Sequence, residues 1–108
     1  MAPTNGVKLQ LDKMRRLRYT NRSLVRLEEE IGLTVEQAGR RVEIGSLKAL
    51  SALVWAGLLH DEPNLTVEKA TEMIEPPLMP LINGLMEALD PWTVDPEEDE
   101  EGNGKAAG

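Results

Sequence analysis

The residues with the clearest potential for chemistry are the single histidine and the two acids that follow it, His60, Asp61 and Glu62. A histidine beside a carboxylate can act as a general base or bind a metal ion. Acyl-transfer catalysis also needs a positioned nucleophile and donors for an oxyanion, and no sequence pattern supplies them. The spacing places His60 at the C-terminus of an expected helix, where the helix dipole favours a cation. We therefore predict no catalytic residue at this position.

Two other groups have compositions associated with ligand binding. Glu28, Glu29 and Glu30 are consecutive, so on a helix their carboxylates point in different directions and do not converge on a metal ion. Residues 102–105, Gly-Asn-Gly-Lys, lack the first glycine of a phosphate-binding loop and follow no expected strand. The absence of cysteine excludes disulfides, thiol catalysis and zinc–thiolate sites. We predict a protein that is not an enzyme and has no metal site and no cofactor.

Positive charge is concentrated near the N-terminus, in a basic segment that spans residues 13–26. Its members are Lys13, Arg15, Arg16, Arg18, Arg22 and Arg26. Such a segment can contact phosphates, so a small nucleic-acid-binding helical domain is one alternative function. The net charge of the whole chain is −7, whereas a nucleic-acid-binding domain is expected to be basic. The charge of the chain therefore argues against nucleic acid as the partner.

The charge also changes sign along the chain. Residues 1–26 carry seven basic residues and one acid, a net charge of +6. Residues 27–89 carry four basic residues and eleven acids, and residues 90–108 carry one and seven, giving −7 and −6. A basic front and an acidic end allow head-to-tail contact between copies or contact with an acidic partner. Solubility alone is the competing interpretation.

A nearly uncharged stretch, Ser46–His60, is the element around which the other helices are expected to pack. Leu47, Leu50, Val54 and Leu58 fall on one helical stripe, and most other positions are also apolar. A helix that is apolar nearly all round is buried in a core or in a membrane. The stretch has fewer than 18 apolar residues in a row, which argues against a membrane span. We predict a central buried helix and no membrane partner.

The rest of the chain predicts a short hairpin and four more helices. Residues 7–11 and 16–19 alternate between apolar and polar, which indicates two strands with a bend around residues 12–14. The expected helices around the central one cover residues 21–31, 35 to about 42, 67 to about 75, and 78–89, and Pro76-Pro77 stops the third of these. Thr20 or Asn21, Thr34 with Gln37, Ser46 and Thr66 are the expected N-terminal caps. The sequence therefore predicts a mainly α fold.

The domain boundaries follow from composition. Residues 1–6 are expected to be a disordered lead without a signal peptide, and residues 7–89 to form the helical domain with its N-terminal hairpin. Residues 90–108 are rich in acids, proline and glycine and are expected to form a disordered acidic C-terminal tail. Trp92 is the exception in that tail, either folding back on the helices or anchoring a partner.

The last helix is unusually apolar for a terminal helix. Leu78, Leu81, Leu85 and Leu89 share a stripe that Met79, Ile82 and Met86 widen. Either the core covers both sides, or one side receives a partner. Helix-in-groove recognition at this helix and strand addition at the hairpin are the expected modes, and we expect self-association through the same surfaces. The candidate partner-binding residues are Arg16, Arg18, Tyr19, Leu78, Met79, Ile82, Met86 and Trp92.

Two stretches resemble a known family. They are residues 7–32, with the pattern TNR-x-L-x-x-LEEE-x-G after a short basic hairpin, and residues 49–74, with ALVWAGLLH followed by a loop into LTVEKA. In this order they are similar to the tail assembly chaperones of long-tailed bacteriophages and gene transfer agents. The resemblance covers residues 7–89 and implies a mainly helical, non-catalytic protein. It transfers no catalytic residue to this chain.

Members of that family coat the tape measure protein during tail assembly and help to recruit tail tube subunits. The resemblance thus implies a tape measure protein as partner, possible contact with the tail tube protein, and action in the host cytoplasm, with no place in the mature virion. A structural subunit of the head–tail connector is a further alternative. Many members also exist in a longer form made by ribosomal frameshifting. If Glu101-Gly102-Asn103 is encoded GAG-GGA-AAC, these codons contain a slippery heptamer, and our hypothesis is that the frameshift occurs there. Other codons at these positions, or the lack of an open −1 reading frame downstream, would exclude this hypothesis.

Overall fold

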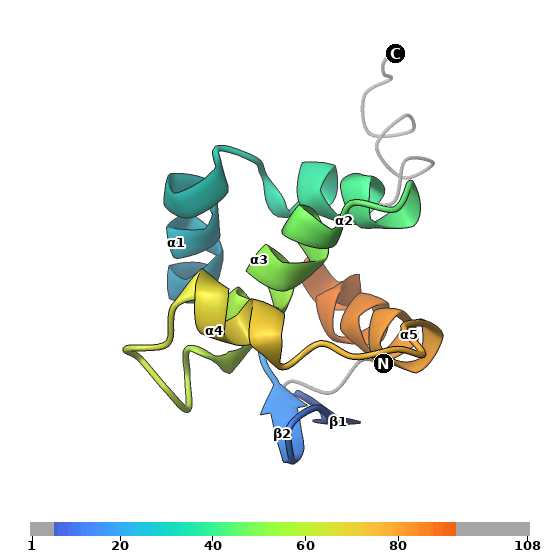
Figure 1. Cartoon of the computed structure of the whole chain (residues 1–108). Coiled ribbons are helices and arrows are strands. Elements are labelled where there is room, and N and C mark those ends of the chain that lie inside the picture. The colour runs from blue at the N-terminus through green and yellow to red at the C-terminus, as the bar shows by residue number, and fades with distance from the viewer. Residues whose placement is uncertain (1–5, 93–108) are drawn as a thin grey trace.

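The computed structural model of the chain describes residues 6–92, in which a short antiparallel hairpin precedes five α-helices (Figure 1). The elements are β1 (Val7–Gln10), β2 (Met14–Leu17), α1 (Asn21–Ile31), α2 (Val35–Glu43), α3 (Leu47–Leu58), α4 (Val67–Glu72), α5 (Met79–Leu89) and the 3-10 helix η1 (Asp90–Trp92). The mainly helical class, the five helices and the N-terminal hairpin are confirmed. Among the described residues, no helix is both long and apolar enough to cross a membrane.

Hydroxyl side chains begin most of these helices. The caps are Thr20, Thr34, Ser46 and Thr66, and each hydroxyl oxygen accepts a hydrogen bond from the backbone N–H three residues later. This bond satisfies an amide that has no partner inside the helix. Gln37 reaches back to the backbone N–H of Thr34 and completes the predicted capping box. Gly32 ends α1 with a φ of 71°, a conformation that glycine adopts without strain.

Helix α3 is the centre of the core, as predicted. Its residues 49–58 are all buried, with α1, α2 and α4 packed around it. The indole Nε1 of Trp55 donates a hydrogen bond to the carbonyl oxygen of Leu65 at 2.7 Å, which fixes the loop before α4. The expected inward stripe is wrong at its first residue, because Leu47 is 59% exposed. Because α3 is apolar on nearly every side, its hydrophobic periodicity does not show that the first residue of the helix lies outside the core.

The hairpin is held between two helices through glycines. β1 and β2 pair antiparallel with Val7 opposite Leu17, which confirms the hairpin, although β2 covers Met14–Leu17 and not the expected 16–19. The backbone N–H beyond β2, at residue 18, donates to the carbonyl oxygen of Gly57 on α3 at 2.9 Å. On the other side, Leu9 lies so close to Gly84 of α5 that a Cβ at Gly84 would overlap Leu9 Cδ2. The two glycines thus allow the hairpin to approach both helix backbones.

Two expected boundaries move. Helix α4 ends at Glu72, earlier than expected, and the helical structure continues beyond Leu89 through η1. Trp92 is partly buried against the core, so it folds back on the helices, and residues 90–92 belong to the described fold and not to the expected tail. The prediction of disorder in residues 1–5 and 93–108 lies outside the described residues.

Candidate partner-binding site

Helix α5 carries an apolar strip that the core leaves partly uncovered. Leu81, Leu85 and Leu89 are buried, whereas Leu78, Ile82 and Met86 are half-buried and four residues apart, so they form a line along the edge of the buried face. Met79, at the first position of α5, is 60% exposed. We name Leu78, Met79, Ile82 and Met86 the α5 strip. All four are among the residues that the sequence predicted to bind a partner.

A small apolar hollow continues from the start of α5 towards the hairpin. It encloses about 110 Å³ and is lined mainly by Leu9, Leu11, Met73, Pro77, Pro80 and Leu81. These residues come from the hairpin, the end of α4 and the start of α5, which meet at this point. The hollow gives an apolar side chain of a partner a place next to the α5 strip.

The edge of β1 lies in the same region. Within residues 6–92 the sheet has only two strands, so β1 has β2 on one side and no strand on the other. Lys8 and Gln10, on the outer face of β1, are exposed. An edge of this kind is a template for another strand. The α5 strip, the hollow and the β1 edge together form the candidate partner-binding site.

The basic segment does not form one continuous surface. Arg16 lies opposite Lys8 on the outer face of the hairpin, and Arg18 follows on the same face. Arg15 points inward, and its side chain is 7% exposed. The guanidinium of Arg26 on α1 stands 5.5 Å from the centre of the Trp55 ring. The structure therefore divides the segment between the hairpin and α1.

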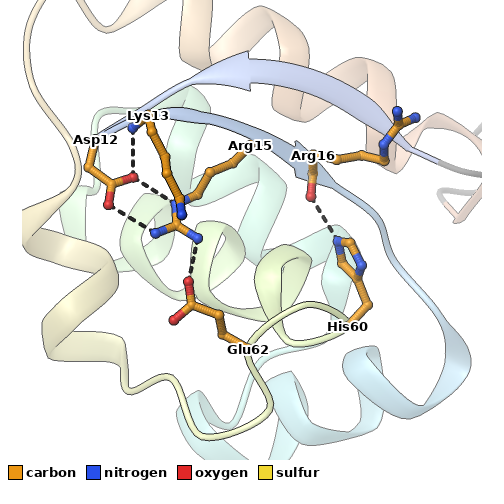
Figure 2. Close-up of polar contacts among 6 residues, drawn as sticks. All are labelled: Asp12, Lys13, Arg15, Arg16, His60 and Glu62. Atoms are coloured by element: carbon orange, nitrogen blue, oxygen red, sulfur yellow. Dashed lines mark hydrogen bonds and ion pairs between the residues drawn. The ribbon is translucent and has the colours of Figure 1, made fainter.

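Arg15 joins the hairpin bend to the loop between α3 and α4 (Figure 2). Its Nε and Nη2 donate to the two carboxylate oxygens of Asp12 at 2.7 and 2.9 Å, and its Nη1 donates to Glu62. These charge-assisted bonds lower the pKa of Asp12 to about 2 and raise the pKa of Arg15. The pairing of Arg15 with Glu62 spans 47 positions of sequence, so no local pattern announced it.

His60 has a structural bond in the same region. Its Nε2 lies 2.8 Å from the carbonyl oxygen of Arg16 (Figure 2). A carbonyl oxygen only accepts, so Nε2 carries the proton and is the donor. His60 and Glu62, two members of the group singled out for possible chemistry, thus both bind the hairpin. Within residues 6–92, no three histidines, cysteines or acids are grouped so that they could hold a metal ion.

Tyr19 is not available to a partner, and that expectation is wrong. The side chain is 5% exposed, and its hydroxyl donates to the carbonyl oxygen of Leu53 on α3 at 2.6 Å. Burial raises the pKa of this phenol well above its ordinary value, so it stays protonated. The alternation of apolar and polar residues predicted a strand that includes Tyr19. Tyr19 instead lies two residues beyond β2, where the chain enters the core.

Comparison of the chain with protein-family models, with curated proteins and with solved structures found no match. The family resemblance therefore rests on residues 7–32 and 49–74 alone.

Proposed function

We propose that this protein is a non-catalytic tail assembly chaperone that binds a tape measure protein and helps to recruit tail tube subunits. In this proposal it acts in the host cytoplasm and is absent from the mature virion. The resemblance of the two sequence stretches supports the family. The observation that carries the binding role is the α5 strip, an apolar surface beside an open strand edge.

The α5 strip suits an amphipathic helix as the bound segment. Leu78, Ile82 and Met86 are four residues apart, with Met79 at one end. Side chains at this spacing form a ridge on a helix surface, and such a ridge packs into the groove of a partner helix. The two methionines give flexible, polarizable contacts, which tolerate different apolar side chains along a long client. The hollow at Leu9 and Pro80 adds a place for one anchor. A long helical client would offer such anchors repeatedly.

Co-expression with the client tests the proposal. The client is the product of the long, helix-rich reading frame expected downstream of this gene, and the readouts are its soluble fraction and its co-purification. We expect the protein to raise both, and Met79→Asp to reduce both, because a charge on the strip opposes burial of an apolar face. Val25→Asp is the matched control, since Val25 is 53% exposed on α1, away from the strip. No gain in client solubility with the unaltered protein would reject the proposal.

The basic outer face of the hairpin favours one second candidate, nucleic-acid binding. Lys8, Arg16 and Arg18 share that face. A duplex DNA titration at about 50 mM and about 200 mM salt would show binding that weakens steeply with salt if phosphates are the ligand. Recovery of the chain from purified phage particles would instead favour the head–tail connector alternative.

A further inference from the structure

A basic groove lies on the side of the molecule away from the α5 strip. It encloses about 500 Å³ between the start of α1 and the loop after α3. Its polar and charged lining residues are Thr20, Arg22, Ser23, Arg26 and His60, and its apolar ones are Leu59 and Pro63. Nothing in the proposed function uses this groove, so its ligand is a separate question.

The polar lining of the groove comes from two sides, with both of its arginines on α1. Arg22 and Arg26 are four residues apart on α1, so their side chains lie one above the other on the same face. His60 stands on the opposite side, held by its bond to the Arg16 carbonyl oxygen. Arg26 lies over the ring of Trp55, which gives its guanidinium a fixed support at the groove.

Acids near the groove limit its positive region to Arg22 and Arg26. Glu62 is already paired with Arg15. Asp61 is exposed next to His60. Glu29 and Glu30 are exposed further along α1, so the positive region is confined to the first turns of the helix. The groove therefore suits a short segment that carries several carboxylates.

The chain itself contains such a segment. Six of the seven residues from Asp95 to Glu101 are acidic. We propose that the groove of one copy binds residues 95–101 of a second copy, so that copies associate head to tail. The guanidinium groups of Arg22 and Arg26 would bind the carboxylates, while Leu59 and Pro63 contact the apolar part of the chain.

The geometry favours a second copy over the same chain. Helices α1 and α5 lie on opposite sides of α3 (Figure 1). Asp95 follows Trp92 by three residues, which span at most about 10 Å when fully extended, and Glu101 follows Trp92 by nine, or about 30 Å. Since packed helices lie about 8–10 Å apart, the first acids of the segment fall short of α1 in the same chain, whereas a second copy can present the whole segment. A second copy meets no such restriction. Each copy has one groove and one segment, so the contact joins different surfaces of two copies and can continue from copy to copy.

Sedimentation velocity of the full chain tests the proposal. We expect concentration-dependent association at about 50 mM salt that is lost at about 500 mM, because the contact is between charges of opposite sign. The variant Arg22→Glu/Arg26→Glu reverses the groove, and Glu97→Lys/Glu98→Lys/Glu100→Lys reverses the segment. Each alone should weaken association by about tenfold or more. Arg40→Glu/Arg41→Glu on α2 changes the charge by the same amount as the groove variant but at another site, and it should leave association unchanged.

Mixing the two reversed variants gives the decisive result. Each supplies the partner that the other lacks, so association should return in the mixture although neither variant associates alone. If the mixture stays monomeric while both variants keep the circular dichroism of the unaltered protein, contact between copies is refuted. The groove variant removes Arg26, which could weaken the fold. The segment variant changes only residues outside the described fold, so it tests the proposal even if the groove variant is destabilised. Association that neither reversed variant weakens would also contradict the proposal, because it would come from another surface.

Discussion

Replacing Gly57 by alanine tests how closely the hairpin is docked on α3. A methyl group at this position would lie 2.9 Å from Leu17 Cδ2 and 3.0 Å from the hydroxyl oxygen of Tyr19. Both side chains are at most 5% exposed, and the Tyr19 hydroxyl is hydrogen-bonded to Leu53, so neither has room to move aside. The same substitution removes a glycine from a helix, which by itself is favourable. The net effect therefore depends on which of the two terms is larger.

The magnitudes favour destabilisation. Helix propensity favours alanine over glycine by about 1 kcal/mol. Overpacking of a tight core costs about 1–3 kcal/mol, and two immobile neighbours place this site in the upper part of that range. We expect Gly57→Ala to lower the free energy of unfolding by about 1–2 kcal/mol. For a domain of this size the Tm should fall by about 5–15 °C.

The chain offers a matched control. Gly39 lies within α2, and no atom stands within 4 Å of a Cβ built there. Gly39→Ala should therefore raise the free energy of unfolding by about 0.5–1 kcal/mol. Urea unfolding followed by circular dichroism measures both variants. Leu17→Val, which removes the nearest carbon, should reduce the cost of Gly57→Ala in a double-mutant cycle. If Gly57→Ala stabilises the protein as Gly39→Ala does, the hairpin does not pack on α3 as described.

Three further predictions concern the core and the hairpin bend. Leu50→Asp should unfold the protein, since Leu50 is 1% exposed, whereas Leu47→Asp should leave the far-UV circular dichroism unchanged because that residue is 59% exposed. The pKa of Asp12 is about 2 against an ordinary 3.8, so its ion pair stabilises the fold above about pH 4, and this contribution disappears as the pH falls towards 2. Asp12→Asn should flatten the pH dependence of urea unfolding in that window, by less than about 1 kcal/mol because the carboxylate is 44% exposed; an unchanged slope would contradict this pairing. Tyr19→Phe should cost about 1 kcal/mol by removing a buried hydrogen bond, and no loss of Tm would mean that the bond contributes nothing.

Local features of the fold were predictable because they depend on neighbouring residues. The reciprocal cap of Thr34 and Gln37, the helix-ending Gly32 and the N-terminal hairpin each follow from residue types within a few positions or from simple alternation. The buried state of α3 followed from its composition alone. These elements set the architecture that positions the α5 strip.

The remaining features depend on contacts between distant segments. The bond between Arg15 and Glu62 and the burial of Tyr19 under α3 arise only when the hairpin meets the helices. A basic segment therefore looked continuous in sequence although Arg15 is turned inward. The two close-approach glycines, Gly57 and Gly84, carried a possible signal, since glycine inside a helix is unfavourable without a packing reason.

Hydrogen exchange of the full chain, alone and with the tape measure protein, tests the central claim most directly. The proposed mode places the client on α5 and along the edge of β1. We predict slower exchange of backbone amides in Val7–Gln10 and Met79–Leu89 when the client is bound, with Asn21–Ile31 and Val35–Glu43 unchanged. Protection confined to α1 and α2, or no change anywhere at saturating client, would contradict the α5 strip as the binding surface.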